Sequence, residues 1–440
     1  MKTPIVDFVK AYIEADVSRL HMPGHKGKSY LGCEALDITE IGGADVLYSA
    51  DGIINESEEN ASSLFRTAHT FYSTEGSSLA IKAMLSIIAK KGDHILATRN
   101  AHKSLIYACA LLDIDVEWIY PDEYTHLCSC NVTSQTVYEA LDKAQKMPAA
   151  VYLTSPDYLG NILDITGISK VCDSFGVPVI VDNAHGAYLA FCNPSMHPIA
   201  LGATMCCDSA HKTLPALTGG AYLHISSKAD KRYTEIARAR LSVFASTSPS
   251  YLILQSLDIC NRVLADGYKE LLDTTVRRVD RLKSELAGLG FSIYKSEPLK
   301  IVIETKKAGY RGTELAELLR KDKLEFEFCD DDYIVAMITP DTREIDFDRL
   351  LCAMSKIEIK APIADIPIYP KKAKKVISLR DAIFCENETV DLSSALGRIC
   401  ASPTVACPPA VPVVMSGELV GESEIALLKR YGIEKIDVVK

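Results

Sequence analysis

Lys212 and Asp182 are the two residues whose types and positions are best suited to chemistry. Asp182 ends an apolar, strand-like run that starts at Val177, and Lys212 follows later in the chain. A lysine amine forms a Schiff base with the aldehyde of pyridoxal phosphate (PLP), and a carboxylate keeps the pyridine nitrogen protonated, so that the ring accepts electrons from a substrate Cα. His211 and Ser209 lie just before the lysine. They add a proton-transfer group and a candidate phosphate ligand.

The residues around Gly76 form a second candidate group. Gly76, Ser77 and Ser78 precede a helical pattern. A glycine turn followed by two hydroxyls at a helix N-terminus offers backbone N–H groups, O–H donors and a favourable dipole to a phosphate. A serine that only caps the helix is the alternative interpretation. We expect these three residues to bind the cofactor phosphate.

Two histidine-bearing segments are further candidates for cofactor binding. Ala184 and His185 lie in the turn after Asp182, at the carboxyl end of a strand, where ligands bind in open α/β sheets. His102 follows a strand expected to end near Thr98. Its ring could stack on a pyridine ring, or it could be a polar loop histidine in solvent.

The C-terminal tail contributes one acidic candidate. Glu418 is the only charged residue between Pro408 and Leu419. It could bind a cationic substrate tail, and a solvated loop carboxylate is the alternative.

Helical and strand patterns alternate from about residue 60 to residue 265 and must position these groups. The helical patterns cover residues 78–90, 104–112, 137–146 and 168–175, and the strand patterns cover 94–97, 116–119, 149–153 and 179–182. This alternation predicts an α/β large domain with a mostly parallel sheet. Residues 251–286 indicate a long helix or helix pair, and the patterns at 300–303, 313–320 and 333–338 favour a small α+β domain.

We therefore expect five parts of the chain: an N-terminal arm (1–40) with a short amphipathic helix, a cofactor-binding large domain (41–275), a small α+β domain (276–360), a linker (361–376) and a C-terminal domain with a final short helix (377–440).

Composition excludes several classes of protein. The 440 residues are 48% hydrophobic and carry a net charge of −10, which argues against nucleic-acid binding. The chain contains no apolar run near the ~18 residues that span a membrane. Its charged N-terminus lacks a signal-peptide pattern. Fourteen cysteines occur without a Cys-x-x-Cys pair, so we expect reduced thiols, no metal site and a cytoplasmic location.

Together these motifs resemble the Orn/Lys/Arg decarboxylase family, PLP enzymes of fold type I (aspartate aminotransferase-like), and in particular its shorter bacterial members. The similar segments are His21-Met22-Pro23-Gly24-His25-Lys26, residues 75–78, 99–104, 181–187, 209–218 and 246–251, and the tail around Pro408-Pro409 and Gly417-Glu418. The resemblance implies a Schiff base at Lys212, His102 stacked on the cofactor, and at least a homodimer, in which residues 246–251 can reach the neighbouring subunit's phosphate. The chain departs from the family pattern at Glu75, Asn183, Tyr188, Gly219 and Ala410, where relatives have Asn, Glu, often His, Gln and Gly.

The resemblance implies decarboxylation of a basic L-amino acid to a polyamine-type amine and CO₂. Arginine is favoured because the compact members often act on it, and lysine and ornithine are possible. After CO₂ leaves, Lys212 or His211 can protonate Cα. Another fold-type-I reaction, such as transamination or aldol cleavage, is an alternative because one fold hosts many chemistries. A degenerate regulatory homologue that binds a partner is the non-enzyme alternative.

Overall fold

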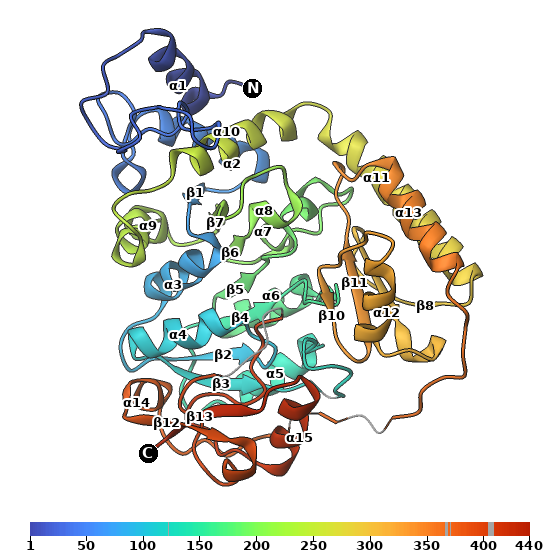
Figure 1. Ribbon diagram of the computed structural model, residues 1–440. Coiled ribbons are helices and arrows are strands. Elements are labelled where there is room, and N and C mark those ends of the chain that lie inside the picture. Colours follow the sequence, from blue (N-terminus) through green and yellow to red (C-terminus); the bar gives the residue numbers. More distant parts are fainter. Residues whose placement is uncertain (122, 366–367, 370, 404–408) are drawn as a thin grey trace. The chain divides into compact units, whose positions relative to one another are not determined.

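The computed structural model describes residues 1–121, 123–365, 368–369, 371–403 and 409–440. Pro408 of the tail motif, with the rest of 404–408, and three residues of the expected linker (366, 367 and 370) lie outside the described residues. The chain divides into two compact units, whose helices and strands are labelled in Figure 1. The first contains residues 1–89, 149–151 and 165–270, and the second contains residues 90–148, 152–164 and 271–440.

The strands of the first unit follow the order β1–β7–β6–β5. Their bounds are β1 (His69–Ser73), β5 (Val179–Asp182), β6 (Met205–Asp208) and β7 (Ala221–Ile225). Strands β5 and β6 are parallel, and β7 runs antiparallel to both β6 and β1. Every residue of β5, β6 and β7 is buried, as expected for strands covered on both faces. Because β5 and β6 are parallel, the residues that follow them emerge at the same edge.

Helices surround these strands. They are α1 (Pro4–Glu14), α2 (Ile53–Phe65), α3 (Gly76–Ile88), α6 (Ile165–Phe175), α7 (Pro198–Leu201), α8 (Ala210–Thr213), α9 (Lys231–Phe244) and α10 (Tyr251–Ala265), with 3-10 helices at Leu47–Ser49 and Ala187–Phe191. Helix α3 packs against β1, β6, β7 and α9. Its apolar residues from Leu79 to Ile87 are buried, so its N-terminus is fixed beside the edge of the sheet.

The second unit contains a parallel pair and two antiparallel sheets. Strands β2 (His94–Thr98) and β3 (Asp115–Ile119) are parallel, and β4 (Val151–Thr154) starts at the division between the units. One antiparallel sheet has the order β10–β11–β9–β8 and the other pairs β12 with β13. Their bounds are β8 (Ser292–Tyr294), β9 (Lys300–Glu304), β10 (Phe328–Cys329), β11 (Tyr333–Met337), β12 (Asn387–Asp391) and β13 (Lys435–Val439).

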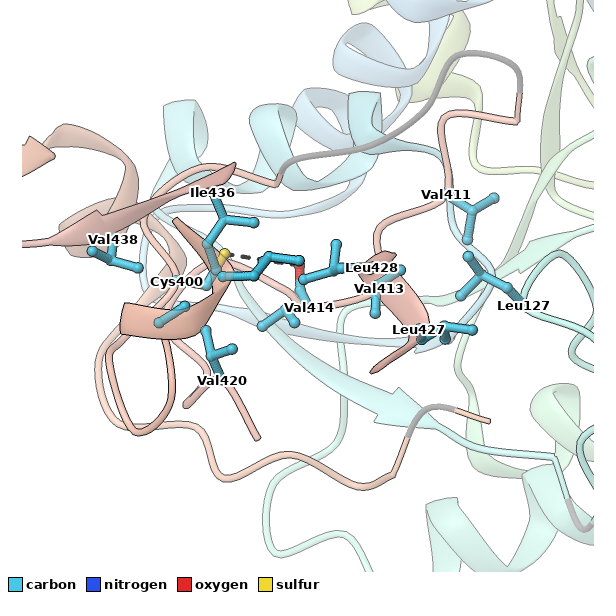
Figure 2. Close-up of a cluster of buried hydrophobic side chains, with 12 residues drawn as sticks. Leu127, Cys400, Val411, Val413, Val414, Val420, Leu427, Leu428, Ile436 and Val438 are labelled. Atoms are coloured by element: carbon cyan, nitrogen blue, oxygen red, sulfur yellow. Dashed lines mark hydrogen bonds between the residues drawn. The ribbon is translucent and has the colours of Figure 1, made fainter. Parts of the chain in front are cut away.

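The helices of the second unit are α4 (Lys103–Leu112), α5 (Ser134–Asp142), α12 (Gly312–Arg320), α13 (Glu344–Ser355), α14 (Leu379–Phe384) and α15 (Glu422–Arg430), with 3-10 helices at Thr305–Ala308 and Leu392–Ser394. Helix α11 (Tyr268–Gly288) begins in the first unit and continues into the second. Near the C-terminus a buried apolar cluster joins β13 and α15 to residues 411–414 (Figure 2).

The structure confirms most elements predicted from periodicity and adds others. Residues 251–286 form a helix pair, α10 and α11. Helix α3 starts at Gly76 rather than Ser78, and the expected final helix is α15. The tail also contains α14, β12 and β13, which the sequence pattern did not predict. Strand β12 is mostly polar and exposed, so its pairing with β13 rather than an apolar face defines it. Within the described residues, no helix has the length and apolar character required to cross a bilayer.

Candidate active site

Lys212 lies in α8, the short helix that follows β6. Its Nζ is 3.0 Å from Nε2 of His185. Nδ1 of the adjacent His211 lies 2.9 Å from the carbonyl oxygen of Gly220, so this ring nitrogen carries a proton. The structure therefore brings a lysine amine and two imidazoles into one region of the first unit.

Asp182 is the last residue of β5 and is only 3% exposed. In the sheet it lies opposite Cys207 of β6. Its Oδ1 accepts a hydrogen bond from the backbone N–H of Ala184 (3.2 Å) and one from the thiol of Cys207 (3.7 Å). These contacts hold the carboxylate at the sheet edge from which β6 continues to Lys212.

The N-terminus of α3 offers an anion site beside this edge. The Ser209 hydroxyl donates a hydrogen bond to Oγ of Ser77 (2.9 Å). Gly76 has a φ of 72°, and a Cβ built there would meet nothing within 4 Å among the described residues. Ser78 lies in the same first turn of the helix. Amide groups and hydroxyls thus flank open space at a helix N-terminus, which is the environment that phosphate groups prefer.

Directly before Ser209, Asp208 forms the centre of a buried polar network. Its Oδ1 accepts a hydrogen bond from the Asn183 amide (2.7 Å). Its Oδ2 accepts from Nε2 of His197 (3.0 Å) and of His224 (3.1 Å). Burial raises the pKa of Asp208, but His197 and His224 outweigh this effect and hold the pKa well below its ordinary value. The carboxylate is therefore ionised.

Sequence reasoning did not find this network. The one local signal was that Asp208 directly precedes the segment that carries Lys212. Its partners come from separate strands and loops, so no spacing in the sequence marks them.

His102 belongs to the second unit, between β2 and α4. It caps α4, since its Nδ1 accepts a hydrogen bond from the backbone N–H of Ser104 (3.2 Å). The same Nδ1 lies 2.9 Å from Oγ of Ser104. The cap fixes the orientation of the imidazole ring relative to the start of α4.

Glu418 also belongs to the second unit and is 2% exposed. Its Oε2 lies 3.2 Å from the guanidinium of Arg99 and accepts a hydrogen bond from the N–H of Met415 (2.9 Å). Burial raises the pKa of Glu418, and Arg99 opposes this shift. The residue predicted to bind a substrate thus has an internal cationic partner that sequence reasoning missed.

The comparison with protein families covers most of the chain. The Orn/Lys/Arg decarboxylase major domain matches residues 3–294, and the C-terminal domain of the same family matches residues 368–431. The chain belongs to the Orn/Lys/Arg decarboxylase family. As a member of this family it is an amino-acid decarboxylase, and PLP is its cofactor.

Relatives of nearly the same length include two bacterial arginine decarboxylases. That of Halalkalibacterium halodurans is 29% identical over 97% of this chain and 93% of its own. The arginine decarboxylase of Bacillus subtilis is 28% identical over 97% of this chain and 93% of its own.

Solved lysine decarboxylases have the same fold. The constitutive enzyme of Escherichia coli superposes with a TM-score of 0.82 at 18% identity, covering 100% of this chain and 82% of its own. The Francisella novicida enzyme gives 0.83 at 18% identity, covering 100% and 81%. The predicted fold class, α/β with a mostly parallel sheet and smaller C-terminal parts, is confirmed.

The first unit fits the cofactor of the Orn/Lys/Arg decarboxylases. PLP needs a lysine amine, a carboxylate for its ring nitrogen and an anion site for its phosphate. Asp182 ends β5 and Lys212 follows the adjacent parallel strand β6, and the Ser209 hydroxyl meets Ser77 at the N-terminus of α3.

Two departures from the family pattern have a structural explanation near that anion site. Glu75 accepts a hydrogen bond from the N–H of Ser246 (2.7 Å), which ties the 246–251 segment to the start of α3. Gly219 has a φ of 98°, and a Cβ there would lie 2.8 Å from the carbonyl oxygen of Thr74. A side chain at Gly219 would therefore displace the backbone before α3.

The other departures lie in well-packed places. Asn183, where the family has Glu, donates to Asp208. A glutamate would instead bring a second carboxylate to a fully buried one. Ala410, where the family has Gly, has a φ of 56°, the left-handed conformation that favours glycine. Tyr188 is fully buried in the 3-10 helix after the Asp182 turn.

Proposed function

We propose that the chain decarboxylates a basic L-amino acid, with arginine as the preferred substrate and lysine or ornithine as weaker ones. The observation that carries the proposal is the position of Lys212, which follows β6 with its amine 3.0 Å from His185, while Asp182 ends the adjacent parallel strand β5. Relatives named arginine decarboxylase that align over almost the whole chain support the choice of arginine. The product would be agmatine, a polyamine-type amine, and CO₂.

In this proposal the site residues have separate roles in cofactor binding and proton transfer. When bound, PLP supplies a ring that accepts the electrons of the broken Cα–carboxylate bond. Lys212 would hold the cofactor covalently, and Asp182 would keep a proton on its pyridine nitrogen. His185 and Ala184 line the turn that orients this carboxylate. Lys212 or His211 then delivers a proton to Cα, since both carry exchangeable protons at the same sheet edge.

The remaining contacts hold the cofactor in place. Gly76, Ser77 and Ser78 at the α3 N-terminus would bind the phosphate together with Ser209. His102 of the second unit would stack on the ring, as the family resemblance implies. The proposal includes a cytoplasmic location and a homodimer as the smallest assembly. It also divides the chain into an arm (1–40), a large domain (41–275), a small domain (276–360), a linker (361–376) and a C-terminal domain (377–440).

The test is CO₂ release from arginine, lysine and ornithine by purified, PLP-loaded protein, with identification of the amine. We expect agmatine as the main product, and no turnover after Lys212→Ala. The exposed lysine after β7 gives a matched control, Lys228→Ala, which should behave as wild type. Absence of CO₂ from all three substrates, in protein that still shows the visible absorbance of bound PLP, would overturn the proposal.

A further inference from the structure

The loop that carries His102 is hydrogen-bonded to the C-terminal tail on both sides of the histidine. Before it, the Arg99 guanidinium donates to the carbonyl oxygens of Pro412 (3.2 Å) and Val413 (3.0 Å). After it, the backbone N–H of Lys103 donates to the carbonyl oxygen of Ala410 (3.0 Å). Residues 99–103 are thus held at both ends by residues 410–413 of the same unit.

The tail segment that holds this loop is itself firmly packed. Val411, Val413 and Val414 are buried with residues of α15 and β13 (Figure 2). The turn that follows depends on Gly417, whose φ is 84° and whose Cβ would lie 2.4 Å from the carbonyl oxygen of Ile377. A buried apolar cluster therefore supports the segment whose carbonyl oxygens accept from Arg99.

Glu418 supplies the charge that this arrangement needs. Arg99 is 3% exposed, and its guanidinium also lies 5.5 Å from the centre of the Trp118 ring. A buried guanidinium without a counter-charge is strongly destabilising. Glu418 lies 3.2 Å away, is itself buried, and uses the same Oε2 to accept from Met415. Through Oε2 the carboxylate thus joins Arg99 to the tail backbone.

We infer that Arg99 and Glu418 form one positioning pair that holds the His102 loop in place for the cofactor, and that Glu418 acts on the reaction through Arg99 rather than by contacting the substrate. The inference rests on the proposed function, because it assumes that His102 contacts PLP. It assigns a role to the only charged residue of the tail motif and to the arginine that begins the histidine loop.

The test compares Glu418→Gln, Arg99→Met and their combination with Glu422→Gln, a matched change at an exposed position at the start of α15. The first readout is the dissociation constant of PLP from the apoprotein. We expect each single change to weaken PLP binding about tenfold, and the double change to be no weaker than the worse single one, because coupled residues are non-additive. Glu422→Gln should leave the constant unchanged.

Trp118 gives a second readout, since it is the only tryptophan in the chain and lies beside Arg99. Its emission in the apoprotein should shift in Glu418→Gln and Arg99→Met, and stay unchanged in Glu422→Gln. If Arg99→Met does not fold, Arg99→Lys replaces it. Lysine retains the charge but not the fork of donors, so this variant should fold and show an intermediate loss of PLP affinity.

Three results would overturn the inference. They are wild-type PLP affinity in the folded single variants, additive losses in the double variant, or a raised KM for arginine in Glu418→Gln with unchanged PLP affinity, which would make Glu418 a substrate contact. Failure of the proposed function has a different signature. In that case the wild-type protein itself would bind no PLP or release no CO₂.

Discussion

Asp208 of the first unit and Glu418 of the second are both buried carboxylates next to segments with predicted cofactor residues. Asp208 precedes Ser209 and Lys212, and Glu418 is paired with the arginine that begins the His102 loop. Asp208 accepts hydrogen bonds from three side chains, and its pKa is held well below its ordinary value. Among the described residues, Glu418 accepts hydrogen bonds from Arg99 and from one backbone N–H, and burial raises its pKa. The comparison shows that the number and kind of donors, rather than burial alone, decide how firmly a carboxylate stays ionised.

The two carboxylates also differ in how far apart their partners lie in the sequence. The partners of Asp208 are 11, 16 and 25 residues away. Glu418 and Arg99 are separated by 319 residues. The Asp208 network is thus formed by residues that are close in the sequence. The pair of Glu418 and Arg99 instead joins the C-terminal tail to the loop that follows β2.

The largest expected effect comes from removing the Asp208 carboxylate. Asp208→Ala leaves His197, His224 and Asn183 without their shared acceptor in a fully buried place. We expect a loss of about 3–5 kcal/mol in the free energy of unfolding, which urea denaturation will measure. A loss below about 1 kcal/mol would show that the network does not stabilise the first unit.

Asn183→Glu introduces the residue that the family usually has and places a second carboxylate beside Asp208. Overpacking and the lost amide donor should reduce the free energy of unfolding by about 2–4 kcal/mol. Adding Asp208→Asn to this variant removes the charge conflict and should restore part of the loss. If Asn183→Glu alone is as stable as wild type, the residue at 183 is not matched to Asp208.

The pH dependence of stability should have opposite signs at the two carboxylates. Asp208 has a lowered pKa in the folded state, so its contribution is present above its unfolded pKa of about 3.9 and is lost as the pH falls. Glu418 has a raised pKa, so its contribution is present below its unfolded value of about 4.3 and declines as the pH rises through the folded value.

Thermal melts from pH 2 to pH 8 test this contrast. The deficit of Asp208→Asn relative to wild type should grow as the pH rises toward about 4 and stay constant at higher pH. The deficit of Glu418→Gln should shrink as the pH rises above about 4.3. Parallel curves for the two variants would contradict the contrast between the two sites.

The smallest expected effect is at Ala410, whose carbonyl oxygen accepts from Lys103. Ala410→Gly relieves a left-handed alanine and should stabilise the protein by up to about 1 kcal/mol, since the greater freedom of glycine in the unfolded chain offsets part of the gain. Ala395→Gly is the control, because Ala395 has an ordinary φ of −89°. That change should destabilise, and a similar effect at both positions would argue against strain at Ala410.

The sequence alone predicted most of the helices and strands and proposed the candidate site residues. The helices and strands between about residues 60 and 265 could be predicted because their apolar residues recur at the spacing of a helix or a strand. Lys212, Asp182 and the Gly76–Ser78 turn were recognisable because each lies in a short motif at the end of a strand or helix. The local conformation of such a motif can be predicted from adjacent residues. The family resemblance rests on the same short motifs, and the family comparison confirms it.

Only the tertiary structure decided which polar groups meet across long distances in the chain. The pairing of Glu418 with Arg99, the donation from Asn183 to Asp208, and the β12–β13 sheet have no local signature. Periodicity reports which side of an element is apolar, but it does not specify which buried donor faces which acceptor. A loop-like tail with one acidic residue therefore suggested a substrate contact from sequence, whereas the fold buries that carboxylate and pairs it with Arg99.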